Sequence, residues 1–451
     1  MENKPHVKLV SFNVDNVEIC ASAARISTTK GNAVEIFEKA KENEKNQELV
    51  QKVLRSGHKS IIEHAVFSFA LKDVSAFVEQ FFIEYRLASF TVKSRRYVDF
   101  SGLGYYIPPE LKDENLNEYC QHMDYLFAAY NRMLENGIPK EDARFLLPYS
   151  FHSNFYCTVN ARELAHIISD IKCGRGKDIP ELQDLADEIM EQVEEVFPCM
   201  HFVIDAISGK SNNTESSGCI IKIKDTMSLI ESEQIGTVSL LNEPSNPTRT
   251  LDMAYRINQP NTNESLDPAK LLKTERLREL EQLSYTFLIS NITLSGITHI
   301  VRHRMQSIMI PPIQGIEHSK FIVPDTIKEN AQLFDIYKDV LEKSNRRMNQ
   351  MSKNEVLRKY SYYYALSGNV MDIMTTMNAR ELLHFIKLRA CNRAQWEIRN
   401  ISVEMLKHLR TSFPELFDYF GPSCFVNGMC PEGKMTCGKM GEVVDNFKNL
   451  T

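Results

Sequence analysis

The stretches TVNARELAHII (158–168) and TMNARELLHFI (376–386) show that this chain repeats itself. Asn160 in the first stretch and Asn378 in the second lie 218 positions apart (378 − 160). Four matches in one order, two of them at the same separation, indicate two diverged copies of one unit. The other three matches are FIEYRLAS (82–89) with IVRHRMQS (300–307), again 218 positions apart, AARIS (23–27) with AYRIN (254–258), and VFPCM (196–200) with SFPEL (412–416).

A polar connector separates the two copies. The stretch SGKSNNTESSG is rich in Ser, Gly, Asn and Thr, which is typical of a flexible linker. Each copy is long enough to bury a core of its own. We therefore expect a first repeat at 1–207, a linker at 208–218, a second repeat at 219–420 and a cysteine-containing tail at 421–451.

Each copy is expected to combine strands with long helices. Residues 34–56 carry apolar residues at helical spacing. VFSFAL (66–71) and YTFLIS (285–290) are short and rich in β-forming residues, so they predict strands. The segments 160–169 and 378–410 predict amphipathic helices. Because strands and helices do not alternate regularly, the pattern indicates an α+β (mixed α/β) fold, and no G-x-G-x-x-G motif supports a dinucleotide-binding fold.

Composition and charge limit the class of protein. The 451 residues carry a formal net charge of −6, which argues against a general nucleic-acid-binding surface. No apolar run reaches the roughly 18–20 residues that span a bilayer. The opening MENKPHVKLVSF lacks the apolar core of a signal peptide. We therefore expect a cytoplasmic protein with no membrane or nucleic-acid partner, whose ten cysteines are reduced.

A basic run marks the second copy. Arg302, His303 and Arg304 follow an apolar segment, and Ser307 lies three residues further on. Three cationic or protonatable groups in a row suit an anionic or polar partner, such as a flavin or the phosphates of a nucleotide. A solvated basic turn is the alternative interpretation.

A second basic group lies in the first copy. Ser94 and Arg96 are two positions apart, and on a strand they would share a face from which to bind a phosphate. Arg144, in ARFLLP (143–148), is the third member of this group. An exposed strand that carries charges is the alternative.

A third group lies on the predicted helix of the second copy. Asn378 and Arg389 are 11 positions apart (389 − 378), close to three helical turns, so they share a face. Arg380 and His384 belong to the same segment. An apolar core stripe with surface ion pairs is the alternative.

Together these segments resemble the flavin-dependent thymidylate synthases, which make thymidylate with FAD rather than with a cysteine nucleophile. The family signature is R-H-R-x-x-S-x-N-E-x-S-x-R. Its matches are IVRHRMQS in the second copy and ASFTVKSRRY (88–97) in the first. AARIS, SGHKSIIEHAVFSF (56–69), ARFLLP and NARELLHFIKLRACNRAQWEIR add to the resemblance, which covers nearly the whole chain as two copies.

The two copies have lost complementary parts of this signature. In the first copy, Glu84 and Tyr85 replace the first Arg and His of the basic run. In the second copy, Tyr362 stands where Arg144 is expected, and the stretch around His58 is lost. Neither copy keeps the Asn-Glu pair. Because the family builds each active site from several subunits of a homotetramer, the resemblance implies composite sites from both repeats in a homodimer.

The resemblance also implies a role for each residue. Arg389 would be the catalytic group that stabilises negative charge on the uracil ring. Ser94, Arg96, Arg144 and Arg389 would bind the nucleotide. The residues implied for the flavin are His58, Ser60 and Glu63 from the first copy and Arg302, His303, Arg304, Ser307, Asn378, Arg380 and His384 from the second.

The implied reaction is methylation of dUMP to dTMP. NADPH would reduce FAD, methylenetetrahydrofolate would supply the carbon, and the reduced flavin would supply a hydride. The first alternative is a relative that acts on another pyrimidine nucleotide or transfers a hydroxymethyl group. The others are a non-catalytic flavin- or nucleotide-binding protein and a nucleic-acid-binding scaffold.

Three cysteines lie in the tail, in GPSCFVNGMCPEGKMTCGK (421–439), which is expected to be a compact loop. Thiolates from Cys424, Cys430 and Cys437 could bind zinc with one further ligand, such as the distant His318 or His408. Their spacing is wider than that of common zinc sites. A reduced tail without metal, or one that forms a disulfide on oxidation, is the alternative, and the sequence assigns no metal.

Overall fold

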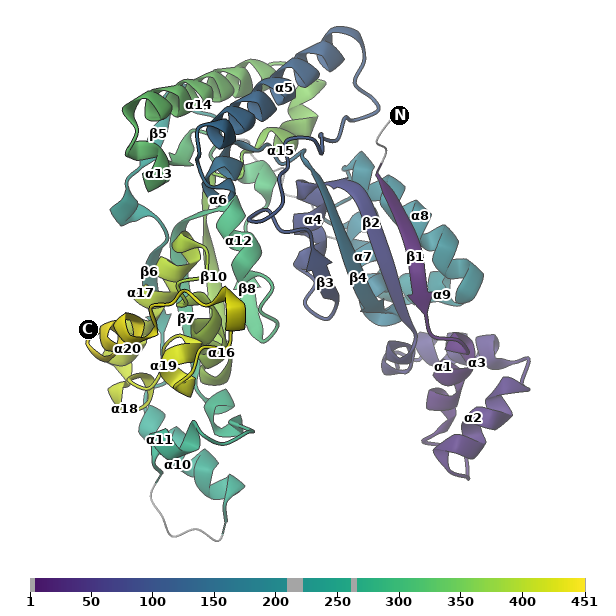
Figure 1. The fold of residues 1–451 in the computed structure, drawn as a ribbon. Coiled ribbons are helices and arrows are strands. Elements are labelled where there is room, and N and C mark those ends of the chain that lie inside the picture. The colour runs from purple at the N-terminus through teal and green to yellow at the C-terminus, as the bar shows by residue number, and fades with distance from the viewer. Residues whose placement is uncertain (1–4, 209–221, 261–265, 451) are drawn as a thin grey trace. The chain divides into compact units, whose positions relative to one another are not determined.

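The computed structural model describes residues 5–208, 222–260 and 266–450, which form two compact units (Figure 1). Unit 1 comprises Met1–Ile221 together with Gln350–Ala365, and unit 2 comprises Lys222–Asn349 and Leu366–Thr451. Residues 209–218 of the predicted linker lie outside the described residues. The segment 350–365 belongs to the second repeat in sequence but to unit 1 in space.

The core of unit 1 is an antiparallel sheet with the strand order β1-β2-β4-β3. Alternate residues of β2 are buried, among them Phe67, Phe69 and Leu71, because successive side chains of a strand point to opposite faces. Helices α7, α8 and α9 pack together against this sheet (Figure 1). The bounds are β1 (His6–Phe12), β2 (Val66–Ser75), β3 (Ser89–Val92), β4 (His152–Asn160), α7 (Ala161–Cys173), α8 (Pro180–Val196) and α9 (Met200–Ser208).

The other helices of unit 1 include a correction to the sequence-based prediction. The helix expected over 34–56 is divided into α2 and α3. The Asn43 side chain accepts a hydrogen bond from the backbone N–H of Lys45 at 2.9 Å, which favours a turn there. The remaining bounds are α1 (Asn16–Arg25), α2 (Ala33–Lys41), α3 (Asn46–Arg55), η1 (Ser60–His64), α4 (Ala76–Ile83), α5 (Asp113–Glu135), α6 (Lys140–Ala143), η2 (Arg144–Leu146), η6 (Leu357–Tyr360) and α15 (Ser361–Tyr364).

Unit 2 repeats the same sheet, with the order β6-β7-β10-β8. Strands β7 and β10 begin 218 positions after β2 and β4 (284 − 66 and 370 − 152). A separate pair of parallel strands joins β5 to β9. The bounds are β5 (Ser228–Ile230), β6 (Thr237–Asn242), β7 (Ser284–Thr293), β8 (Gln306–Met309), β9 (Lys320–Ile322) and β10 (Val370–Asn378).

The two sheets share an irregularity as well as an order. Asp73 in β2 and Asn291 in β7 both have a positive φ, of 52° and 55° respectively. Each lies where the strand register shifts against its central neighbour. Asp and Asn tolerate this left-handed backbone better than other residues with a side chain, and the bulge bends the strand. A matched defect at positions 218 apart confirms the mixed helix-and-sheet fold as a tandem duplication.

The helices of unit 2 include a second correction. The helix expected over 378–410 ends at Arg389 and restarts at Trp396, where the Gln395 side chain accepts the backbone N–H of Ile398 at 3.1 Å and so caps the new helix. The tail is also more helical than the loop that was expected. The bounds are α10 (Pro247–Asn258), α11 (Pro268–Leu271), η4 (Arg278–Gln282), α12 (Leu294–Ile300), η5 (Ile313–Gly315), α13 (Asp325–Lys328), α14 (Ala331–Met351), α16 (Ala379–Arg389), α17 (Trp396–Ser412), α18 (Pro414–Phe417), α19 (Ser423–Asn427), η7 (Gly433–Met435) and α20 (Met440–Lys448).

No helix among the described residues is both long and apolar enough to cross a bilayer.

Candidate functional site

His303 is the centre of a polar cluster in unit 2, in the turn between α12 and β8. Its side chain is buried, and Nδ1 lies 2.9 Å from Glu381 Oε1. Arg389 Nε donates to His303 Nε2 at 3.1 Å. Because Nε2 accepts that hydrogen bond, the proton of the neutral ring is on Nδ1 and is donated to Glu381. Glu381 therefore orients His303, and His303 in turn orients Arg389.

The electrostatics of the cluster keep this histidine neutral. Burial lowers the pKa of His303 below its ordinary value, and the Arg389 guanidinium lowers it further, although the hydrogen bond to Glu381 raises it. The rings of His384 and Phe385 pack at centroid distances of 5.6 and 4.9 Å. The positive charge of the cluster thus lies on arginine rather than on the imidazole.

The other residues predicted for the flavin in the second repeat lie around this cluster. Arg302, Arg304 and Ser307 are exposed, and Ser307 pairs with Thr376 between β8 and β10. The Asn378 side chain caps α16 by accepting the backbone N–H of Glu381 at 2.9 Å. Asn378 thus has a structural role, whatever else it binds.

Three of the four residues predicted for the nucleotide meet in unit 1. Arg96 Nε donates to Glu141 Oε2 at 2.7 Å, and Arg144 Nε donates to the Glu141 carbonyl oxygen at 3.0 Å. Ser94 Oγ accepts the backbone N–H of Arg96 at 3.3 Å. The structure therefore brings Ser94, Arg96 and Arg144 together, with Glu141 as the shared partner.

The backbone that carries these residues differs from the prediction. Ser94 and Arg96 were expected on a strand, but β3 ends at Val92, and the Val98 N–H donates to the Ser94 carbonyl at 3.0 Å, which closes a turn. Arg95 anchors this turn, because its guanidinium forms a 2.8 Å ion pair with Glu79 in the core. The strand prediction was wrong because a buried arginine holds the chain in a turn at this point.

The stretch around His58 in unit 1 has a counterpart in unit 2, contrary to the expectation that the second copy had lost it. His58, Ser60 and Glu63 are exposed, and Glu63 pairs with Arg162 at 2.5 Å. At positions 218 further on, Glu281 in η4 pairs with Arg380 in α16. Of the residues that define the first-repeat motif SGHKSIIEH, only the glutamate is present in the second repeat, so the sequence comparison did not find the match.

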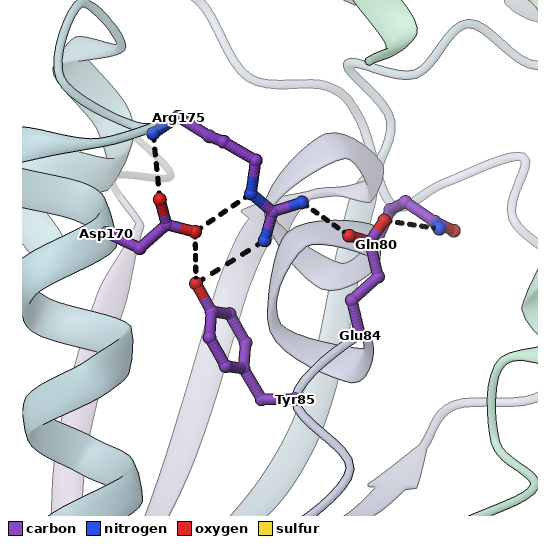
Figure 2. Close-up of polar contacts among 5 residues, drawn as sticks. All are labelled: Gln80, Glu84, Tyr85, Asp170 and Arg175. Carbon is purple, nitrogen blue, oxygen red and sulfur yellow. Dashed lines mark hydrogen bonds and ion pairs between the residues drawn. The ribbon is translucent and has the colours of Figure 1, made fainter. Parts of the chain in front are cut away.

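Figure 2 shows the unit 1 position that corresponds to His303, which holds Tyr85. The Tyr85 hydroxyl donates to Asp170 Oδ2 at 2.5 Å, and Arg175 Nε donates to the same oxygen at 2.8 Å (Figure 2). Arg175 also donates to Glu84 Oε2 at 2.6 Å. Burial raises the pKa of Tyr85, and Asp170 raises it further. The Arg175 guanidinium thus bonds to two carboxylates, and the Tyr85 phenol bonds to one of these two.

Both repeats of the chain match the same known protein family. The family described as "Thymidylate synthase complementing protein" matches twice, over residues 8–199 and 239–415. The chain belongs to this family. The family is that of the flavin-dependent thymidylate synthases, and its two matches confirm both the resemblance and the tandem arrangement that the repeats predicted.

Curated flavin-dependent thymidylate synthases align with about one repeat of the chain. The one from Clostridium tetani is 32% identical over 215 residues, which cover 44% of this chain and 85% of the relative. Those from Geobacter sulfurreducens and Pyrococcus horikoshii are each 32% identical over 40% and 42% of this chain, and 80% and 78% of the relatives. The expectation of an enzyme of the flavin-dependent family is confirmed.

A solved structure also aligns with one repeat. A UMP/dUMP methylase, PolB from Streptomyces cacaoi, shares 24% identity over 45% of this chain and 96% of its own, with a TM-score of 0.37.

Three glutamates of the thymidylate synthase fold were missed as functional residues. Glu381 orients His303, Glu141 joins Arg96 to Arg144, and Glu281 pairs with Arg380. The signal for Glu381 was available, because NARE occurs in both repeats. Glu281 also had a signal, because it lies 218 positions after Glu63, whereas Glu141 is defined only by contacts that the fold creates.

A pocket of about 610 Å³ opens in unit 2 between α10 and η4. Arg249 and Thr250 from α10 and Arg278 and Glu279 from η4 contribute to its walls. These two elements hold AYRIN and the counterpart of SIIEH. Both segments of the pocket are therefore counterparts of first-repeat segments that resemble the family.

Each cysteine that the structure describes is a free thiol, and Cys219 lies outside the described residues. Within the described ranges, no three His, Cys, Asp or Glu side chains already stand in an arrangement that could hold a metal ion.

Proposed function

We propose that the protein methylates dUMP to dTMP with bound FAD, with methylenetetrahydrofolate as carbon donor and NADPH as reductant. The arrangement of Glu381, His303 and Arg389 carries this proposal. A guanidinium held by a neutral histidine is fixed in advance and can stabilise negative charge that develops on a uracil carbonyl. Membership of the flavin-dependent thymidylate synthases supports the same chemistry.

The donor set of unit 2 fits a flavin dinucleotide. Arg302 and Arg304 are exposed on either side of the buried His303, so cationic donors face outward from one turn. We propose that they hold FAD, together with Ser307, Asn378, Arg380 and His384. When bound, the reduced cofactor supplies the hydride that completes the methyl group.

Unit 1 would supply the nucleotide side of the site. Arg96 and Arg144 are fixed by the same residue, Glu141, and a pair of oriented guanidinium groups suits a phosphate. Ser94 adds a hydroxyl, and His58, Ser60 and Glu63 would contact the cofactor. We propose that each active site combines these residues with the cationic turn of unit 2, in a homodimer that replaces the tetramer of single-repeat relatives.

A direct assay tests the reaction. Purified protein should be yellow and should convert dUMP to dTMP when methylenetetrahydrofolate and NADPH are present. Flavin-loaded protein that turns over no pyrimidine nucleotide would point to a binding protein instead. The absence of the Asn-Glu pair from both repeats favours one variation, a different pyrimidine substrate. Parallel assays with UMP and dCMP would identify it.

Light scattering and flavin titration test the assembly. We expect a homodimer with one FAD per chain, because only the second repeat keeps the whole Arg-His-Arg run. An active monomer, or four equivalent FAD molecules per dimer, would contradict composite sites. The domain limits 1–207, 219–420 and 421–451 and the cytoplasmic location remain predictions.

A further inference from the structure

Four cysteines gather in unit 2, where the tail packs on α16 (Figure 1). Cys391 lies two residues beyond the end of α16, Cys424 lies in α19, and Cys430 and Cys437 lie between α19 and α20. The Ser423 hydroxyl donates to the Lys387 carbonyl at 3.2 Å, which ties α19 to α16. The tail thus returns to the end of the helix that carries Arg389.

Electrostatic interactions link each of the four thiols to at least one of the others. Cys391 interacts electrostatically with Cys430 and Cys437, and Cys424 interacts with Cys391 and Cys430. Asn392 Nδ2 lies 4.0 Å from Cys437 Sγ, so the residue next to Cys391 contacts the last cysteine of the tail. The fold supplies what the tail sequence lacks, which is a fourth cysteine beside the three at 424, 430 and 437.

The backbone turns tightly around these cysteines. The Arg393 N–H donates to Cys391 Sγ at 3.5 Å, two residues further along the chain. Gly433 and Gly438 follow Cys430 and Cys437 closely and have φ of +52° and +73°. Glycine adopts these values without strain, so the chain can turn tightly beside each sulfur.

We propose that Cys391, Cys424, Cys430 and Cys437 together bind one zinc ion. Four thiolates form the tetrahedral all-sulfur site that zinc favours, with Zn–S distances of about 2.3 Å, whereas calcium and magnesium prefer oxygen. The four thiols are gathered but not yet at ligand spacing. Binding would draw the exposed tail turns inward, and each thiol would lose its proton to solvent.

Of the two histidines that the sequence offered as a fourth ligand, one is buried next to β9 and the other bonds to β6. His318 is 2% exposed and lies two residues before β9. His408 Nε2 lies 3.0 Å from the Val238 carbonyl in β6. Cys391 is the better ligand, and zinc bound there would fix the tail against the end of α16 without taking part in methyl transfer.

Elemental analysis of the full-length protein, purified without chelator, tests the site. We expect about one zinc per chain. Single Cys→Ser changes at 391, 424, 430 and 437 should each lower the zinc content at least several-fold. Cys173→Ser is the matched control, because Cys173 is an exposed thiol of unit 1, and its zinc content should stay unchanged. Cobalt exchanged for zinc should give the intense visible bands of tetrahedral thiolate coordination.

Three results would overturn the proposal. The first is less than about a tenth of a zinc per chain in protein whose four cysteines all react with a thiol reagent under native conditions. The second is a disulfide between any two of the four in protein kept under reductant. The third is iron with acid-labile sulfide in place of zinc. Flavin content, measured on the same samples, separates failure of this site from failure of the proposed methylation.

Discussion

The cluster around Tyr85 in unit 1 and the cluster around His303 in unit 2 occupy equivalent places in two copies of one fold, but they satisfy their charges differently. In unit 1, Arg175 bonds to Asp170 and Glu84 (Figure 2). In unit 2, one ring nitrogen of His303 bonds to Glu381 and the other accepts a hydrogen bond from Arg389. The same scaffold thus carries a network of internal ion pairs in one copy and an arginine held by a neutral histidine in the other.

The difference follows from exchanged side chains on equivalent elements. Asp170 and Ile171 correspond to Leu388 and Arg389, each 218 positions on. Exchanging a carboxylate for leucine and isoleucine for arginine reverses the local charge, while β4 with α7 and β10 with α16 keep the same design. We infer that a duplicated site can lose its ligand-binding role when carboxylates of the protein itself pair with its arginine.

The largest expected effect tests which cluster does the chemistry. Arg389→Ala should lower kcat for dUMP methylation by roughly 10²- to 10³-fold, the usual loss when one charge-stabilising donor is removed. Arg175→Ala in unit 1 is the matched control and should keep its turnover while the melting temperature falls modestly. Steady-state kinetics and thermal unfolding measure both. Equal losses of kcat in the two variants would refute the division between the clusters.

The next effect concerns flavin retention. Arg302→Ala or Arg304→Ala should weaken FAD binding by about ten- to hundredfold, because a charge-assisted hydrogen bond is worth roughly 1.5–3 kcal/mol. Arg86→Ala, at the position equivalent to Arg304, should matter less, since the first copy lacks the rest of the basic run. Flavin absorbance after gel filtration provides the measurement. The comparison fails if the Arg86 and Arg304 variants lose flavin equally.

Unit 1 should instead govern the nucleotide. Arg96→Ala and Arg144→Ala should each raise the KM for dUMP by about tenfold or more while FAD stays bound. Because Arg144 is buried, its variant also needs a melting curve to show that the fold survives. The exposed Arg132→Ala, on α5, is a control that should leave the KM unchanged. Unchanged nucleotide affinity in both test variants would remove unit 1 from the substrate site.

The smallest effect is a pH dependence that belongs to unit 1. Glu181 accepts hydrogen bonds from Ser75 and Tyr363, but burial raises its pKa to about 7. Its folded-state pKa is above its unfolded value, so its contribution to stability is full below about pH 4.5 and is lost as the pH rises through 7. From pH 6 to pH 8 we expect a loss of about 1 kcal/mol. Chemical unfolding should show this slope in the wild type and a flatter profile in Glu181→Gln.

Sequence reasoning captured the repeat because identical letters at a constant separation need no three-dimensional information. It also placed the basic run and the α16 arginine, which the structure joins through His303. It missed the turn at Ser94–Val98, since nothing local shows that Arg95 is paired with Glu79 in the core. It overlooked Cys391 as a partner of the tail for the same reason, because it lies 33 positions (424 − 391) before Cys424.

The segment 350–365 makes the duplication difficult to reverse. It is encoded in the second repeat, yet within unit 1 the Ala365 carbonyl accepts the Tyr149 N–H at 2.7 Å, and the Tyr363 hydroxyl donates to Glu181 at 2.6 Å. A gene cut at the linker would give a first half without these partners, with Glu181 left short of one donor in the core. The two halves have therefore become heritable as one piece, and fission back to two independent genes would first require unit 1 to rebuild the part it borrows.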